Sequence, residues 1–383
     1  MGARFLNRPR MAGACLLLTL VVATGGCSRT DPGTESKATV ACEVLYGAVD
    51  DGGPNAAVHR GMVAARRTLG VELRTHSGTQ PDLAPLVEEH GCDVVVATGS
   101  PLGNAVLQLA KQHPDISFVI VDRFFDFTSA EDLVRRNVRI VAYRSDQVAF
   151  LAGYLAGGVA GPHHERGPGP AGPHGEHIEA RHEGAVATFG GANNAHNRVV
   201  MDAFRAGVLA YGEDNDEEID LLGWNGRDGL FTGSDVDIAG ARRITNRLID
   251  RGAGVVFSVA GGAGVGAIRA VLTAGKGVVI DSGGWSLGRP HRYSKVLLAG
   301  IVKRSEEASF DAVRDVAGGS FTGGLEVGTL TNRGVDLELM NRDVGHLPES
   351  LRRNVEELEV ALRRGLVSID AADYEPTGHE HHN

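Results

Sequence analysis

Five polar residues each follow a run of apolar residues in this 383-residue chain: Asp50, Asn55, Asp122, Asp281 and Lys303. Carboxylates accept hydrogen bonds from hydroxyl pairs, and an amide both donates and accepts. A buried carboxylate also needs a donor or a cation beside it. In an open parallel sheet, ligands bind beyond the carboxyl ends of the strands. The set therefore predicts a site for a small, polar, uncharged molecule.

A glycine-rich loop follows the apolar run 255–259 and opens a helix. Its residues Gly261 and Gly262 would let backbone N–H groups approach a ligand closely. The glycine spacing does not match GxGxxG, and the sequence contains no GxSxG elbow or P-loop. We expect a binding protein without a cofactor, and no enzyme. A planar ligand could stack on Phe231 or Trp224, although both could equally be core residues.

Apolar runs alternate with amphipathic segments along the chain, which is typical of parallel sheets covered on both faces. The expected strands are 39–46, 71–76, 92–97, 117–121, 138–144, 184–189, 220–223, 255–259, 277–280, 296–301 and 324–330. The expected helices begin near 55 and 305 or span about 82–90, 102–113, 147–157, 198–211, 238–251, 264–274 and 351–362. The sequence predicts an α/β protein with two doubly wound lobes joined by several crossovers.

The order of these elements predicts where each lobe begins and ends. We place one lobe at 39–146, with about 283–323 returning to it, and the other at 147–282, with about 324–340 returning to it. A C-terminal helix and tail occupy 345–383. Residues 161–183 are an insertion rich in Gly, Pro and His; without the spacing of a known metal motif, we expect a solvated loop and no metal site.

The N-terminus resembles a secretion signal. A basic segment precedes the apolar stretch Met11–Ala23, which is too short to span a bilayer. Small residues then lead into Cys27, as in a lipobox, although Thr24 stands where Leu or Val is usual. We expect a signal peptide at 1–26 and a lipid-anchored tether at 27–38 on the extracytoplasmic face of the cell membrane. Cleavage without lipidation is the alternative.

Two further observations bound the function. The formal net charge of −10 argues against a nucleic-acid partner, which would require a basic face. Besides the predicted anchor Cys27, the cysteines of the predicted mature chain are Cys42 and Cys92, each at or near the start of an expected strand. Outside the cell they could form a disulfide if those strands are neighbours. Two buried thiols are the alternative.

Several segments, in this order and spacing, resemble the basic membrane protein family of substrate-binding lipoproteins, which includes purine nucleoside receptors of ABC importers. The resemblance covers about 39–369, and the segments that carry it are 50–55 (DDGGPN), 118–122 (FVIVD), 150–153 (FLAG), 190–191 (GG), 204–207 (FRAG), 260–264 (AGGAG), 302–304 (VKR) and 347–349 (LPE).

This resemblance implies a type I periplasmic-binding-protein fold with a nucleoside-like ligand between two lobes. Position by position, it implies that Asn55 and Asp122 contact the base and that Phe231 stacks on it. Three further positions, Asp50, Asp281 and Lys303, would hold the ribose, and Gly261 and Gly262 would line it. Asn55 could instead cap the helix that follows it. Pro54 stands where the family has a stacking Phe, and residues 282–284 (SGG) stand in place of a Ser-Asp-Gln-like turn.

The sequence therefore predicts a lipid-anchored solute-binding protein of an ABC importer. Its partners would be the small-molecule ligand, the ABC permease and ATPase subunits, and the membrane. A surface sensor that signals through a partner protein and a secreted enzyme that uses the glycine-loop cleft are the alternatives.

Overall fold

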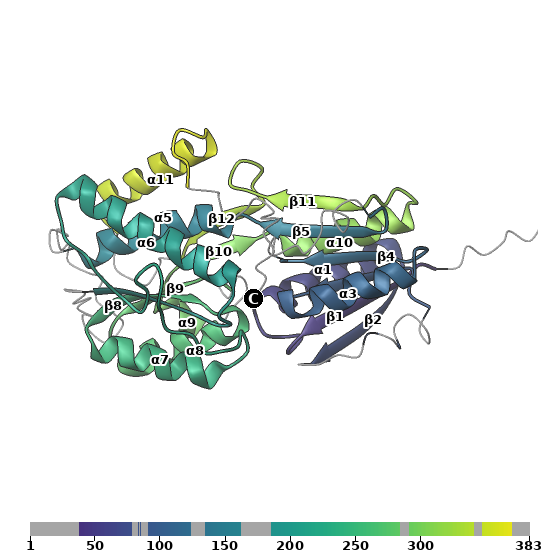
Figure 1. The fold of residues 1–383 in the computed structure, drawn as a ribbon, viewed down its shortest axis with the longest axis horizontal. Coiled ribbons are helices and arrows are strands. Elements are labelled where there is room, and N and C mark those ends of the chain that lie inside the picture. Colours follow the sequence, from purple (N-terminus) through teal and green to yellow (C-terminus); the bar gives the residue numbers. More distant parts are fainter. Residues whose placement is uncertain are drawn as a thin grey trace, which may run out of the picture. The chain divides into compact units, whose positions relative to one another are not determined.

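The computed structural model describes residues 38–78, 83, 85, 91–123, 135–161, 185–283, 291–340 and 347–369. Ala38–Asn383 form one compact unit that contains two six-stranded sheets (Figure 1). The predicted signal peptide, Cys27, most of the expected helix at 82–90, the His-rich insertion and the tail lie outside the described residues.

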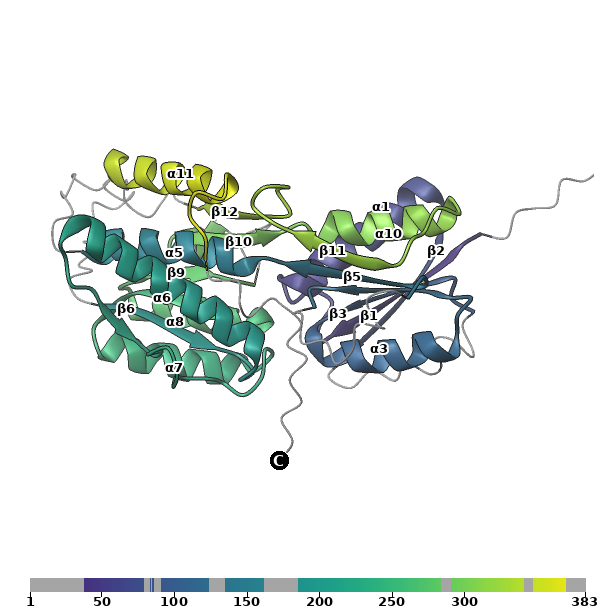
Figure 2. The ribbon, with the colours of Figure 1, turned by 45° about the horizontal axis from the view of Figure 1, so that its top comes forward.

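The first sheet is entirely parallel, with the strand order β11-β5-β4-β3-β1-β2. Its strands are β1 (Val40–Tyr46), β2 (Glu72–Gly78), β3 (Val94–Thr98), β4 (Ser117–Val121), β5 (Val138–Tyr143) and β11 (Gly324–Gly328). All residues of β3 and nearly all of β1 are buried, because helices cover both faces of the sheet. Figure 2 shows α1 (Pro54–Leu69) and α10 (Ser305–Ala317) on one face and α3 (Ser100–Gln112) on the other.

The second sheet has the order β12-β10-β9-β8-β6-β7. Its strands are β6 (Ala185–Gly190), β7 (Asp220–Leu222), β8 (Ala253–Val259), β9 (Val278–Asp281), β10 (Leu297–Lys303) and β12 (Val335–Leu339). The β10–β12 pair is antiparallel and the other pairs are parallel. Its helical segments are α5 (Ser145–Ala160), α6 (Ala195–Asn215), α7 (Ile238–Asp250), η1 (Gly261–Gly264), α8 (Val265–Ala274), α9 (His291–Ser294) and α11 (Glu349–Arg363).

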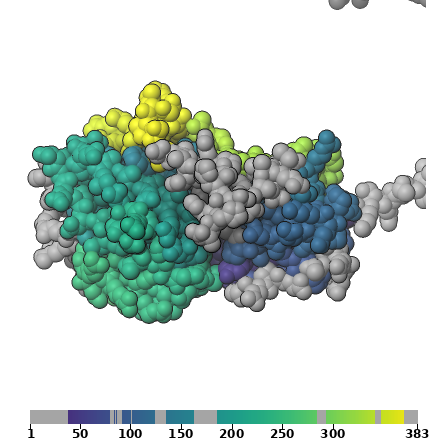
Figure 3. Space-filling view, viewed as in Figure 1, coloured from purple at the N-terminus to yellow at the C-terminus, as the bar shows by residue number. Residues whose placement is uncertain are grey.

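Helices α5 and α6 pack unusually closely because glycines lie at their contact. A Cβ atom on Gly153 would lie 2.0 Å from the carbonyl oxygen of Phe204, and one on Gly207 would lie 2.0 Å from that of Phe150. Figure 3 shows the segment of α11, in yellow, at the surface of the molecule. The apolar stripe of this helix packs against the core through Leu351. The first turns of α5 and α6 contribute residues to the lining of a cavity, among them Ser145 and His196.

The two-lobed α/β architecture is as predicted, but the crossovers differ from the expected boundaries. The chain passes between the sheets after β5, after β10 and after β11. Consequently β10, within the 283–323 segment expected in the first lobe, pairs with β9 in the second sheet. Strand β11, expected in the second lobe, pairs with β5 in the first. Apolar runs identify strands but not the sheet they join, and β12 was not expected at all.

The sequence left two states open for Cys42 and Cys92, and the structure shows a disulfide. Cys42 lies in β1, and Cys92 lies two residues before β3. Because β1 and β3 are hydrogen-bonded neighbours, the two Cα atoms are 5.9 Å apart, within the range that a disulfide spans.

Candidate functional site

A cavity of about 100 Å³ lies where the carboxyl ends of strands from both sheets meet, and we call it the central cavity. The first sheet contributes the loops after β1, β3 and β4, and the second contributes the start of α6, the loop before α7, and η1. Its lining includes five of the residues singled out from the sequence: Asn55, Asp122, Gly261, Gly262 and Lys303.

An ion pair joins the two sheets at this cavity. Lys303, the last residue of β10, donates through Nζ to both carboxylate oxygens of Asp122 at 2.8 Å. The side chains are only 13% and 15% exposed. Burial raises the pKa of Asp122, but the positive charge of Lys303, with a smaller contribution from His196, outweighs burial and lowers it. Asp122 also has φ of 60°, a backbone conformation that is uncommon outside glycine and clusters at functional sites.

The loop after β1 is held by two side chains that bond to the protein itself. Asn55 donates through Nδ2 to the carbonyl oxygens of Tyr46 and Ala48, at 2.9 and 3.1 Å, and its Oδ1 accepts from the hydroxyl of Thr98 at 2.5 Å. Asn55 is the second residue of α1 and not its cap. Asp51 serves the helix N-terminus instead, since its Oδ1 accepts from the N–H groups of Gly53 and Ala56.

The second sheet contributes a polar group that the sequence analysis missed. Asp235, in the loop before α7, accepts through Oδ1 from the backbone N–H of Ala192 at 3.0 Å and from Nδ2 of Asn197 at 3.2 Å. Asn194 caps α6 by accepting from the N–H of Asn197 at 2.9 Å. Burial raises the pKa of Asp235, and these two donors only partly offset it.

His196 lies in the first turn of α6 and also lines the central cavity. Burial and then the positive charge of Lys303 lower the pKa of His196 to about 4, against the opposing effect of Asp122 and Asp146. Its imidazole is therefore neutral at pH 7 and offers one donor and one acceptor. The strand-end rule, applied to β6 as it was to the other strands, would have found His196 and its neighbours.

The predicted glycine loop lies close to two carboxylates, that of Asp51 beside the first sheet and that of Asp235 beside the second. Gly261 has φ of +49°, which favours glycine. A Cβ atom on Gly262 would lie 3.5 Å from Oδ2 of Asp51, and one on Gly261 would lie 3.2 Å from Cβ of Asp235. The backbone of this turn thus lies at the cavity, close to residues of both sheets.

Three residues of the expected set lie outside the lining of the central cavity. Asp281, the last residue of β9, is fully buried, and its carboxylate accepts from the N–H of Gly283 at 3.1 Å. Phe231 packs edge-to-face on Trp224, with ring centroids 6.1 Å apart, and against Gly190. Asp50 lines a different cavity, described next.

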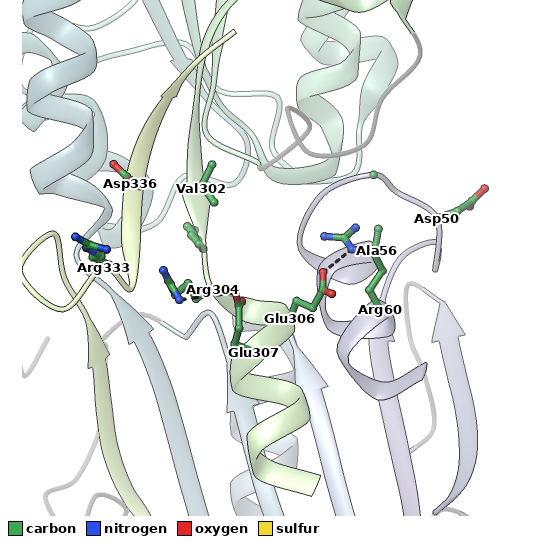
Figure 4. Close-up of a pocket in the computed structure, with 11 residues that line it drawn as sticks. Asp50, Ala56, Arg60, Val302, Arg304, Glu306, Glu307, Arg333 and Asp336 are labelled. Carbon is green, nitrogen blue, oxygen red and sulfur yellow. Dashed lines mark hydrogen bonds and ion pairs between the residues drawn. The ribbon is translucent and has the colours of Figure 1, made fainter. Parts of the chain in front are cut away.

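This second, lateral cavity has a volume of about 730 Å³ and shares Lys303 with the central one. It lies between the start of α1, the end of β10, the start of α10 and the turn before β12 (Figure 4). Its charged lining residues are Asp50, Arg60, Lys303, Arg304, Glu306, Glu307, Arg333 and Asp336. Figure 4 shows Arg60 and Glu306 pointing toward one another, and they form an ion pair at 2.6 Å.

The described residues contain neither a candidate metal site nor a helix that could span a membrane. No group of three or more His, Cys, Asp or Glu side chains in that part of the chain is placed to hold a metal ion. Among the helices of the same described ranges, none is both long and apolar enough to cross a membrane.

Comparisons with known proteins show a matching family model and several relatives. The model of the Bmp family, described as PnrA-like ABC transporter substrate-binding proteins, matches residues 38–329. Basic membrane protein D of Borreliella burgdorferi is 23% identical over 68% of this chain and 66% of its own length. An uncharacterised lipoprotein of Pyrococcus abyssi is 26% identical over 84% of this chain and 74% of its own.

A solved structure shows the same fold. An ABC transporter solute-binding protein from Aeropyrum pernix superposes with a TM-score of 0.68 at 20% sequence identity, covering 88% of this chain and 95% of the other. The chain spans just under two thirds of the length of basic membrane protein D and 54% of basic membrane protein B of Borrelia garinii.

Proposed function

The chain belongs to the Bmp family of PnrA-like ABC transporter substrate-binding proteins, and we propose that it captures a small, polar, nucleoside-like ligand in the central cavity outside the cell and delivers it to an ABC permease and its ATPase. Proteins of this family bind solutes and are not enzymes. The proposal includes a lipid anchor at Cys27, which would keep the protein at the extracytoplasmic face of the membrane.

One observation carries the proposal. Polar groups from two distant parts of the chain, Asp122 and Lys303, meet at a cavity that both sheets line. Ligands of open α/β sheets bind at such carboxyl ends. A receptor needs no nucleophile or poised base there, only groups that accept and donate hydrogen bonds.

The residues expected to bind the ligand fall into three groups, according to the contacts that they make in the structure. In this proposal Asp122, Lys303 and the backbone at Gly261 and Gly262 contact the ligand directly. Asn55 and Asp281 bond to the protein and would support the loops around it. Asp50 and Phe231 would reach the ligand only after a rearrangement, so we assign them no contact in the present arrangement.

Ligand entry requires movement in this proposal. The central cavity, at about 100 Å³, is smaller than the roughly 300–1,000 Å³ of typical small-molecule pockets. We propose that the crossovers after β5, β10 and β11 act as hinges that separate the lobes, that ligand binding favours the closed form, and that the permease recognises this form.

A thermal-shift screen with nucleosides, sugars and amino acids tests the ligand assignment. A ligand at 100 times its Kd should stabilise the protein by about 2.7 kcal/mol, which gives a clear rise in melting temperature. Lys303→Ala should abolish that response. If sugars or amino acids raise the melting temperature while every nucleoside leaves it unchanged, the nucleoside-like assignment is wrong.

Mass spectrometry of the mature protein tests the anchor. The wild-type chain should begin at Cys27 and carry the mass of added acyl groups, and Cys27→Ser should release the protein from the membrane fraction. An unmodified N-terminus would contradict lipidation without affecting the ligand proposal.

A further inference from the structure

Asp235 offers one carboxylate oxygen to the central cavity. Oδ1 accepts two hydrogen bonds, from Ala192 and Asn197. Oδ2 makes no hydrogen bond to a residue of the described ranges, and it is not enclosed by protein. These two donors position the carboxylate beside Gly191, where a side chain would leave it no room, because a Cβ atom there would lie 2.0 Å from Oδ1. The lining of the central cavity therefore includes a carboxylate oxygen that accepts no hydrogen bond from a described residue.

The charges around the cavity are unbalanced. Among the described residues that line it, Asp51, Asp122 and Asp235 are acidic and Lys303 is basic. Both oxygens of Asp122 already accept from Lys303. No described lining cation remains for Asp235, and bringing a phosphate or carboxylate into this space would place like charges close together in a poorly hydrated site.

A second, independent polar group belongs to the lining of the same cavity. Ser145, the first residue of α5, lines the cavity and is only 2% exposed. Its buried hydroxyl makes no hydrogen bond within the described part of the chain. Leaving a buried polar group unsatisfied costs about 1–3 kcal/mol, so a ligand that supplies a hydroxyl partner would recover part of that cost.

From these three observations we infer that the central cavity selects a hydroxylated ligand that carries an amine, that Asp235 Oδ2 accepts a hydrogen bond from this amine, and that phosphorylated or carboxylate ligands are excluded. The inference rests on the proposed function and names the chemistry that the site requires. An amino nucleoside and an amino sugar both supply it, and the experiment below separates them.

Two matched pairs of probes test the amine: adenosine against inosine, and glucosamine against glucose. The amine-bearing member of one pair should bind the wild-type protein at least about tenfold more tightly than its partner, as measured by isothermal titration calorimetry. The pair that shows the difference identifies the source. Equal binding within both pairs, or no binding by any of the four probes, overturns the inference.

Asp235→Asn tests the residue. The amide keeps an oxygen for Ala192 and Asn197 but places an NH₂ group where Oδ2 was, so affinity for the amine-bearing probe should fall by about 10- to 150-fold. Asp237→Asn is the control, because Asp237 lies two residues away and its carboxylate caps α7 by accepting from Gly240. It should leave the affinity unchanged. An unchanged affinity in Asp235→Asn contradicts the assignment of this residue.

Two further measurements do not depend on how Asp235→Asn folds. Ser145→Ala should weaken binding by about 2- to 10-fold, the range for one neutral hydrogen bond. AMP, or glucosamine 6-phosphate if the sugar pair responds, should fail to displace the unphosphorylated probe from the wild-type protein. Displacement at similar concentrations would overturn the exclusion of anions. If solutes without an amine bind the central cavity while Asp235→Asn has no effect, the inference fails and the receptor function stands.

Discussion

The central and lateral cavities both contain ion pairs, but they hold them in different environments. In the central cavity of about 100 Å³, Lys303 and Asp122 are 13% and 15% exposed. In the lateral cavity of about 730 Å³, Arg60 and Glu306 are 42% and 45% exposed. Apart from Lys303, which lines both cavities, the larger space is thus lined by charges that water can reach.

This difference teaches that volume alone does not identify a ligand site. Half-exposed charges exchange readily with water and ions and gain little from any one partner. Buried charges interact more strongly, and they cost more when they lose a partner. The central cavity also contains the uncommon backbone conformation of Asp122 and the buried hydroxyl of Ser145. These features, and not its size, are the reason that we propose the central cavity as the ligand site.

The largest expected effect comes from removing one partner of the buried pair. Asp122→Ala should lower the free energy of unfolding by about 3–5 kcal/mol in urea denaturation at pH 7, because it leaves the ammonium group of Lys303 buried without its counterion. Ligand binding should be lost with it. A decrease below about 1 kcal/mol would mean that the central pair behaves like a surface pair, and the contrast between the cavities would disappear.

A smaller effect should appear in the pH dependence of the protein's stability, through His196 at the central cavity. Because the pKa of His196 is lowered to about 4 from 6.5, the unfolded chain takes up a proton in this interval while the folded protein does not. Stability should therefore fall as the pH drops from about 6.5 to 4, by at most about 3 kcal/mol from this group.

Urea titrations at several pH values measure this dependence. His196→Gln removes the titrating group and should flatten the curve across the same interval, while Arg60→Ala, in the lateral cavity, should keep its slope. Identical slopes in the wild type and His196→Gln would contradict the lowered pKa.

The smallest effect is expected in the lateral cavity. A double-mutant cycle on Arg60→Ala and Glu306→Ala should give a coupling energy below about 1 kcal/mol, because both side chains are nearly half exposed. The ligand-induced rise in melting temperature should be unchanged in all three variants. A loss of that response would show that the lateral cavity participates in binding.

Much of the architecture could be predicted from the sequence. Strand β4 has the expected bounds, and most other strands and helices agree within a few residues. The reason is that buried strands are runs of apolar residues and amphipathic helices repeat apolar residues at a characteristic spacing. The positions of Asn55, Asp122, Lys303, Gly261 and Gly262 at one cavity also followed from reading strand ends.

Sheet membership was harder to predict. The sequence placed β10 and β11 in the wrong lobes because both are short segments whose residue types fit either sheet. Pairing partners are chosen by contacts between residues distant in the chain, such as those of α10 with α1. A local pattern contains no information about these contacts.

What the sequence determined by itself is therefore the family, the α/β alternation and the strand ends at which polar groups gather, since each is recorded in residue types close together along the chain. Only the tertiary structure decided that Asn55 bonds to its own loop, that Phe231 packs on Trp224, and that Asp235 and Ser145 face the central cavity. The reason is that the role of a polar side chain depends on the partners that it contacts. Those partners come from segments remote in the sequence, and only the folded structure brings them together.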